Sequence, residues 1–492
     1  MSEFATPSID WAGLSPYLIA LFGTAVILLT SVFLRTSMRR GFASAGAAIT
    51  LLGSLAATLT LYALDRTASG LVADAIQRDD LAHLTQAILF GTAILAVMVA
   101  HRERTSDEHA GEFFGLLVAA VAGMAFLAAS SNLMTLFLGL EWFSICLYLL
   151  TSIATDRVRS LEAGLKYLVI GSFASAVLLF GLALVYGATG TINFIEIGQA
   201  VEPDNLLLMT GLSMILIGLG FKVSAAPLHQ WTPDVYEGAP TSVTGFMAAA
   251  TKVSVFVLAL RLLNTAFPEQ ADFWTIVLGV LATISLAWGN LAALAQRDMK
   301  RILAYSSVSH AGFLLMPLAA GNALGGRALL FYLIPYAAMT VGAFAVVAAR
   351  ERELGRPVDL DALSGMGWER PFLSAAMAVF MLGFIGLPPS GLFLGKFYAF
   401  AALYDRGWIW LMVIGAVFTA VSVYYYLGVV RSMYMRDLPV DAPVVAGDSP
   451  PRDRLLLAAV GASLVVAVGT FFGVDPLVDV IRESTDFLTY PF

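Results

Sequence analysis

Apolar stretches long enough to cross a bilayer follow one another along nearly the whole chain. A membrane core about 30 Å thick needs roughly 20 mostly apolar helical residues to cross it, and about fourteen such runs are present. This pattern predicts an all-α polytopic membrane protein with about fourteen transmembrane helices. The expected limits are residues 16–34, 41–64, 80–100, 112–129, 131–154, 161–187, 205–236, 241–264, 273–295, 299–319, 327–349, 371–404, 408–433 and 454–473.

Composition agrees with this class and excludes a soluble enzyme. Of the 492 residues, 59% are apolar and 13% are charged, whereas soluble domains hold about 45–50% apolar and about 25% charged residues. The longest polar segments, residues 65–80 and 436–454, leave no room for a soluble catalytic domain.

Two of the expected spans contain prolines that should interrupt them. The seventh reads KVSAAPLHQWTP around Pro227 and Pro233, and the twelfth reads GLPPSGLFLGK around Pro388 and Pro389. Proline removes a backbone hydrogen bond and clashes with the preceding turn. Irregular backbone at membrane depth is tolerated only where it is buried in protein or lines a cavity. We therefore expect two helices that are broken in mid-membrane.

The basic residues indicate how the chain is oriented. Of the 28 Lys and Arg residues, 18 lie in loops that follow odd-numbered spans, 5 lie on the other side and 5 lie within spans. Short cytoplasmic loops carry an excess of Lys and Arg. The loops after odd-numbered spans are thus predicted to face the cytoplasm, and both termini are predicted to lie outside.

Several kinds of site are excluded by what the sequence lacks. Cys146 is the single cysteine, and zinc sites held by thiolates and iron–sulfur clusters need several. The sequence contains no glycine-rich dinucleotide motif, no P-loop and no cluster of metal-ligand residues. Its basic residues form short loop clusters rather than a nucleic-acid surface. We expect no cofactor or metal in this chain and no nucleic-acid partner.

Four charged residues lie near the middle of a predicted span or beside one of the two breaks. Glu141 and Lys252 lie near the middle of the fifth and eighth spans, and Lys222 and Lys396 stand beside the two proline breaks. A charged side chain at a helix centre costs about 2.5–3.5 kcal/mol on insertion scales, so such residues are functional candidates by default. Together they suggest a connected polar interior.

The chain uses Arg for most of its charge and has only five lysines. Lysine suits proton transfer because its pKa shifts readily on burial, whereas a guanidinium stays protonated. Lys166 follows Glu162 by four residues, so it is either a relay residue or half of a helix-surface ion pair. Lys300, in the RDMKR cluster, is either a relay residue or a topology anchor.

Two histidines and a set of hydroxyl side chains could complete a relay. Histidine ordinarily titrates near neutrality, which makes His229, in PLHQW, and His310, in SSVSHAGF, candidates for a relay between lysines. A histidine bonded to a backbone carbonyl is an equally good interpretation of each. Hydroxyl residues near them could hold ordered waters or simply pack helices together. The hydroxyl candidates are Thr251, Tyr305, Ser306, Ser307 and Ser309.

Five motifs, read in order, resemble the antiporter-like membrane subunits of proton-pumping NADH:quinone oxidoreductase (respiratory complex I), and among them the subunit N family. The resemblance covers about residues 100 to 440. The motifs are FLGLEWFSICLYLL, EAGLKYLVIGSFASAVLLFGLALVYGATGT, GFKVSAAPLHQWTPDVYEGAP, MKRILAYSSVSHAGF and GLPPSGLFLGKFYAF.

The resemblance implies two inverted five-helix repeats within a four-part chain. Three N-terminal helices would occupy residues 1–111, the first repeat 112–264, the second repeat 273–433, and a last helix and tail 434–492. It implies that Glu141 faces Lys222, that Lys166 lies near this glutamate, and that Lys252, Lys300 and Lys396 match further family lysines.

The resemblance also implies partners and location. NADH, FMN, iron–sulfur clusters and quinone would belong to other subunits of a hetero-oligomer, which includes other antiporter-like and small membrane subunits. The chain would lie in the lipid bilayer of a bacterial inner membrane. Protons would pass from Lys222, paired with Glu141, through Lys252 to Lys396 and outward. A sodium/proton antiporter subunit of the Mrp type and a purely structural membrane subunit are the alternatives.

Overall fold

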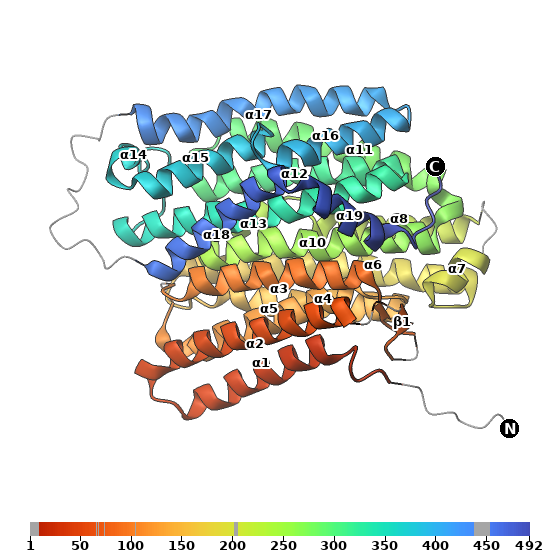
Figure 1. Ribbon diagram of the computed structural model, residues 1–492, viewed down its shortest axis with the longest axis horizontal. Helices are drawn as coiled ribbons and strands as arrows, with labels where there is room; N and C mark the ends of the chain where they lie inside the picture. The colour runs from red at the N-terminus through yellow and green to blue at the C-terminus, as the bar shows by residue number, and fades with distance from the viewer. Residues whose placement is uncertain are drawn as a thin grey trace.

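The computed structural model describes residues 9–64, 66, 68–72, 74–103, 105–200, 205–436 and 453–492. Its helices run side by side in one bundle, and the described chain begins and ends at the same end of that bundle (Figure 1). An even number of crossings is therefore present.

Within these residues, twelve helices are long and apolar enough to cross a membrane. They are α1 (Ser15–Phe33), α2 (Thr36–Leu64), α3 (Asp80–Ala100), α4 (Ala110–Ala128), α5 (Leu133–Ser152), α6 (Val158–Thr189), α10 (Thr241–Ala266), α11 (Ala271–Leu294), α12 (Met299–Ala320), α13 (Ala323–Leu354), α17 (Ile409–Met435) and α18 (Arg454–Phe472). Two more spans are each made of two shorter helices, α8 (Leu206–Lys222) with α9 (Thr232–Gly238), and α15 (Pro371–Ile385) with α16 (Gly391–Asp405). The prediction of about fourteen spans is confirmed.

The remaining elements are short or lie at the ends of the bundle. A small hairpin pairs β1 (Ser69–Gly70) with β2 (Gln77–Arg78). Single turns of 3-10 helix cover Asp107–His109 and Pro268–Gln270, and α7 (Phe194–Ala200) and α14 (Met366–Glu369) are short connecting helices. The amphipathic helix α19 (Val474–Thr485) follows the last span and was not predicted, because its few apolar residues cannot form a membrane-spanning run.

Both predicted helix breaks are present, and protein groups satisfy their freed backbone. In the first break, the backbone N–H of Ala226 donates to Ser285 Oγ at 2.8 Å. In the second, Gly386 adopts a φ of +90°, and a Cβ placed there would lie 2.8 Å from the Lys396 side chain. Glycine is therefore required where the chain turns over the lysine.

The two halves of the bundle repeat the same local pairing at opposite ends. Asn132 caps the start of α5 and pairs with Asn193 beyond α6, and Asp298 caps the start of α12 and pairs with Asp359 beyond α13. Five spans separate the two caps, so the second half crosses in the opposite direction. This is the arrangement of an inverted five-helix repeat.

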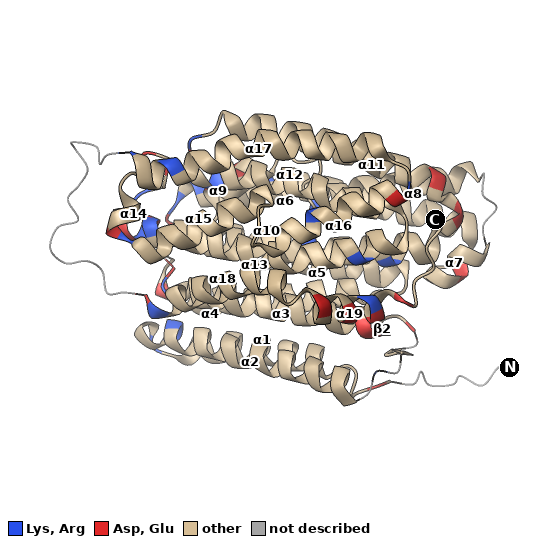
Figure 2. Ribbon diagram, turned by 45° about the horizontal axis from the view of Figure 1, so that its top comes forward, with Lys and Arg blue, Asp and Glu red and all other residues tan. Residues whose placement is uncertain are grey.

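Charged groups gather at the two ends of the bundle (Figure 2). Most Lys and Arg residues lie at the end opposite the described termini, which we call the basic end; the end with the termini is the outer end. Among the described residues, ion pairs join groups of the same end, for example Arg352 with Asp453 at the basic end and Arg66 with Asp80 at the outer end. Two of the basic residues in the orientation argument, Arg104 and Arg452, lie outside the described residues.

The helix that carries Lys252, α10, forms the centre of the bundle together with α12 and α13. In the most apolar stretch of α10 every residue is buried, and in the corresponding stretches of α12 and α13 94% of the residues are buried. The corresponding stretches of α1, α2, α17 and α18 are only 28% buried. Lys252 on α10 therefore lies within protein on every side.

Close contact between α11 and α12 depends on Gly289. A Cβ at this position would lie 2.5 Å from the backbone nitrogen of Ser309. Gly289→Ala should push the two helices apart and destabilise the chain by about 1–3 kcal/mol. The measurement is thermal loss of this chain from the purified membrane assembly. Gly91→Ala in α3 is the control, because nothing lies within 4 Å of its Cβ position; equal behaviour of the two variants would contradict the prediction.

Candidate functional site

Lys252 is joined to a hydroxyl cluster in the centre of the bundle. Its Nζ donates to Ser307 Oγ on α12 at 2.6 Å, and its side chain is almost fully buried. Ser307 Oγ also lies 3.5 Å from the hydroxyl of Tyr236 on α9 and 3.3 Å from that of Tyr336 on α13. We call Lys252, Ser307, Tyr236 and Tyr336 the Lys252 group. It brings together the broken helix of the first half and two helices of the second.

A second hydrogen-bonded cluster surrounds His310. Ser306 Oγ lies 2.5 Å from the hydroxyl of Tyr426 on α17, which lies 3.1 Å from His310 Nε2. The other ring nitrogen, Nδ1, is 2.7 Å from the hydroxyl of Tyr332 on α13. We call Ser306, Tyr426, His310 and Tyr332 the His310 group. Both ring nitrogens have hydroxyl partners, so the ring can accept a proton at one side and release one at the other.

Lys396 occupies the second helix break. Its Nζ donates to the carbonyls of Phe384 and Ile385, at 3.1 and 2.9 Å, which are left free where α15 ends. It also lies 3.9 Å from the centre of the Phe313 ring, a favourable position for a cation. The break therefore creates the acceptors that hold the lysine.

Lys222 lies beside the first break, where it contacts hydroxyl groups. Its Nζ donates to Ser144 Oγ at 2.7 Å and to the Tyr148 hydroxyl at 3.3 Å, both on α5. The resemblance implied that Lys222 pairs with Glu141. Among the described ion pairs, no contact within 4.0 Å joins these two residues, and their charges attract each other only over a longer distance. Glu141 instead accepts a hydrogen bond from Ser175 on α6. On α5, the lysine therefore contacts the hydroxyls of Ser144 and Tyr148, which follow Glu141 along the helix.

Lys166 forms ion pairs at the basic end and makes no contact with Glu141. Its Nζ lies 2.8 Å from Glu162 and 2.9 Å from Asp234 on α9. Arg301 of α12 pairs with the same Asp234 at 3.0 Å and with Glu237 at 3.0 Å. The helix-surface ion pair is confirmed, and it belongs to a network that fastens α9 to both halves.

The remaining predicted residues have contacts outside the two central groups. Lys300 is buried and donates to the Ala239 carbonyl at 2.7 Å, just beyond α9, which is the contact of an anchor. His229 packs against the rings of Trp288 and Tyr305, and its Nδ1 has no hydrogen-bond partner within the described residues. Thr251 donates to the backbone of its own helix.

Sequence reasoning missed the tyrosines that connect these residues. Tyr236, Tyr332, Tyr336 and Tyr426 are all at most 1% exposed. A tyrosine buried in an apolar span normally finds a partner for its hydroxyl, so tyrosines in spans near the lysines were an available signal. The sequence could not say which helices would bring their hydroxyls together.

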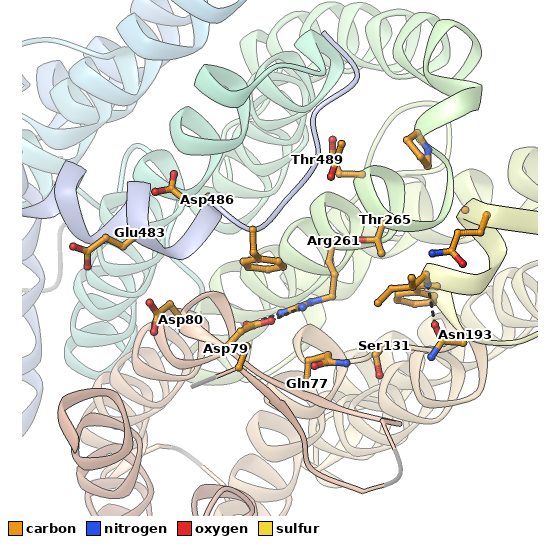
Figure 3. Close-up of a pocket in the computed structure, with 18 of the residues that line it drawn as sticks. Gln77, Asp79, Asp80, Ser131, Asn193, Arg261, Thr265, Glu483, Asp486 and Thr489 are labelled. Carbon is orange, nitrogen blue, oxygen red and sulfur yellow. Dashed lines mark hydrogen bonds and ion pairs between the residues drawn. The ribbon is translucent and has the colours of Figure 1, made fainter. Parts of the chain in front are cut away.

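A buried ion pair lies at the outer end, beside a cavity of about 780 Å³ (Figure 3). Arg261, near the end of α10, donates two hydrogen bonds to Asp79, at 2.6 and 2.9 Å. Burial raises the pKa of Asp79, but the charge and hydrogen bonds of Arg261 outweigh burial and hold this pKa below its usual range. Asp79 also caps α3 by accepting from the Ala82 N–H. The pair therefore ties the central helix to α3.

The described residues contain no group of three or more His, Cys, Asp and Glu side chains that could hold a metal ion. The arrangement that remains is a series of buried amines, hydroxyls and an imidazole. These groups can donate and accept protons.

Comparisons with known proteins give one consistent result. Residues 130–422 match the family model described as NADH:quinone oxidoreductase/Mrp antiporter, TM. NADH-quinone oxidoreductase subunit N 1 of Herpetosiphon aurantiacus is 38% identical over 98% of this chain and 97% of its own length. A chain of respiratory complex I from Thermus thermophilus with bound aureothin has a TM-score of 0.80 at 33% identity, covering 95% of this chain and 100% of that one. A chain of the Mrp complex from a Dietzia species has a TM-score of 0.82 at 21% identity, covering 97% and 98%, and shows the fold alone.

Proposed function

The chain belongs to the NADH-quinone oxidoreductase subunit N family, and from this premise we propose that it translocates protons as a membrane subunit of such an oxidoreductase. NADH, flavin, iron–sulfur clusters and quinone are assigned to partner subunits. The chain sits in a bacterial inner membrane, with the basic end in the cytoplasm and both termini outside. Its parts are residues 1–111, repeats at 112–264 and 273–433, and the segment 434–492.

The observation that carries this proposal is the hydroxyl contact of each interior lysine of α8 and α10. Lys222 bonds Ser144 and Lys252 bonds Ser307, so neither amine is fixed in a contact ion pair. A charge on either lysine is therefore balanced by polar neighbours that also accept or donate protons. A lysine locked against a carboxylate would keep its proton more firmly.

In the proposed mechanism, a proton enters from the cytoplasm at Lys222, where the charge of Glu141 attracts it. It passes by way of Tyr236 and Ser307 to Lys252, and then through the His310 group toward Lys396, which releases it outward. Moving one charge against 100 mV requires about 2.3 kcal/mol. A change of between one and two pKa units corresponds to that energy, so a change in the contacts of one buried lysine is sufficient.

The outward stripe of α5 supports assembly with partner subunits. Glu141 lies on the same helix face as four large apolar side chains that are each at least half exposed in the isolated chain. These are Met134, Leu138, Ile145 and Leu149. A carboxylate in mid-membrane is costly against lipid, so a neighbouring subunit is expected to cover this face.

Replacing the lysines at the two breaks tests the relay. Lys222→Met and Lys396→Met remove the amine and keep most of the side-chain volume, so NADH-driven acidification of inverted membrane vesicles should fall at least about tenfold while the complex still assembles. Arg356→Met is the control, since this residue is half exposed at the basic end. Wild-type pumping in both lysine variants would refute the relay, and lost assembly with normal pumping per complex would favour a structural role.

The reaction that drives proton transport distinguishes the proposed function from that of an Mrp-type antiporter subunit. The family model covers both kinds of protein, and the Mrp likeness extends only to the fold. Proton transport that needs NADH oxidation supports the proposal. Sodium-dependent proton exchange without NADH would favour an antiporter subunit.

A further inference from the structure

The Lys252 group and the His310 group approach each other without a direct hydrogen bond. Ser307 belongs to the first and Ser306 to the second, and these residues are adjacent on α12. Within the described residues, no hydrogen bond joins one group to the other. A proton that moves from Lys252 toward His310 must therefore cross this gap.

A small cavity lies at the gap. It has a volume of about 10 Å³. Its polar lining consists of Ser306 from the His310 group, Ser307 and Tyr336 from the Lys252 group, and Thr340, which belongs to neither group. The rest of its wall is apolar and includes Phe344 and Phe384. The polar atoms are thus collected at one point in an otherwise apolar region.

Thr340 has an unexplained hydroxyl at this cavity. The residue is 5% exposed, and its Oγ1 has no hydrogen-bond partner within the described residues, although the Tyr336 hydroxyl is nearby. Tyr332, Tyr336 and Thr340 follow one another at four-residue spacing, so they share one face of α13. A buried hydroxyl without a partner costs free energy, and an ordered water is a common partner for such a group.

We propose that this cavity binds one water molecule, which Thr340 positions so that it joins the Lys252 group to the His310 group. A volume of about 10–15 Å³ suffices for one water, which needs two to four polar partners. Ser306, Ser307, Tyr336 and Thr340 supply them. The inference rests on the proposed proton-relay function and adds a positioning residue that the mechanism above does not include.

The transfer through this water balances its protons. The Lys252 ammonium gives a proton to Ser307 Oγ, and Ser307 gives its own hydroxyl proton to the water. The water gives one of its protons to Ser306, which passes its hydroxyl proton to Tyr426 and so toward His310. Tyr426 in turn gives its hydroxyl proton to His310 Nε2, which lies 3.1 Å away. Every oxygen then ends with the number of protons it had at the start, Lys252 has lost one proton and His310 has gained one.

Thr340→Val tests the site, because valine keeps the shape of threonine and removes the hydroxyl. In coupled membrane vesicles, NADH-driven pumping per assembled complex should fall roughly tenfold, about the factor expected for one lost hydrogen bond in the transfer. Thr340→Ser keeps a hydroxyl and should restore most of the rate. The matched control is Thr251→Val, beside Lys252, whose hydroxyl bonds only its own backbone.

Each outcome has a distinct meaning. A Thr340→Val complex that pumps like Thr251→Val, or a Thr340→Ser complex as slow as Thr340→Val, overturns the water site. Lys252→Met is measured in the same vesicles: if it pumps normally, the proposed function itself fails. If Lys252→Met is inactive and Thr340→Val is normal, only the water site fails.

Discussion

A complex that carries Lys252→Arg is expected to assemble and yet to pump protons at least about a hundredfold more slowly than the wild type, the range for loss of a proton-transfer group. Arginine preserves the positive charge and can still donate to Ser307, which Lys252 contacts at 2.6 Å. Its guanidinium does not release a proton at physiological pH. The variant should therefore keep the helix packing and the buried positive charge, while proton transport through this position stops. The measurement is NADH-driven acidification of inverted vesicles, normalised to assembled complex.

Lys300→Arg is the matched control for that experiment. Lys300 is also a buried lysine, but it lies at the start of α12 at the basic end, and its Nζ donates to the Ala239 carbonyl beyond α9. An arginine can make the same donation, so this variant should pump normally if Lys300 is an anchor. If Lys252→Arg pumps at the wild-type rate, Lys252 contributes charge rather than proton exchange.

The second large effect is expected on stability, at the outer end of the bundle. Asp79→Asn removes the carboxylate that accepts two hydrogen bonds from Arg261 and leaves the guanidinium buried without its counterion. Breaking a buried ion pair in this way costs about 3–5 kcal/mol. The variant should lower the thermal transition of the assembled complex markedly. Asp361→Asn is the control, since its ion pair with Arg436 is exposed on both sides and is worth about 0–1 kcal/mol.

The same pair predicts how stability depends on pH. The pKa of Asp79 is held below its usual range, so its stabilising contribution is present above the unfolded value of about 3.9 and is lost as the pH falls through the lower folded value. Acid should therefore destabilise the wild type more than Asp79→Asn. Equal acid sensitivity and an unchanged thermal transition in the variant would show that the pair contributes little.

The sequence predicted the spans well because membrane crossing leaves a strong local signal. The expected limits 80–100 and 299–319 agree with α3 and α12 to within one residue. The prolines located both breaks for the same reason: a missing backbone donor is a property of the residue itself. Amphipathic α19 was missed because it does not cross the membrane and has no long apolar run.

The sequence identified three lysines of the candidate site but not the residues that they contact. Burial cost identifies Lys222, Lys252 and Lys396 from position alone, and all three lie inside the bundle. Their partners come from distant parts of the chain, and no local pattern encodes these pairings. Lys166 shows the difference. Its pair with Glu162 could be predicted from the four-residue spacing, whereas its contact with Asp234 depends on how α9 packs.

Arg261 is a residue whose role could not be predicted from the sequence. It stands in an apolar run without a nearby acid in sequence, so the sequence does not indicate which residue balances its charge. The partner, Asp79, lies 182 residues away at the start of α3. Only the packing of α10 against α3 identifies this arginine as a structural residue of the outer end.

Passage of protons through this chain by way of Lys252 is the main step of the proposed mechanism. It is tested most directly by counting protons translocated per NADH oxidised in sealed vesicles that contain the Lys252→Arg complex, alongside the wild type and Lys300→Arg. We expect the residual NADH oxidation of the Lys252→Arg complex to move fewer protons per NADH than that of either of the other two complexes. An unchanged ratio in a fully assembled Lys252→Arg complex would contradict it.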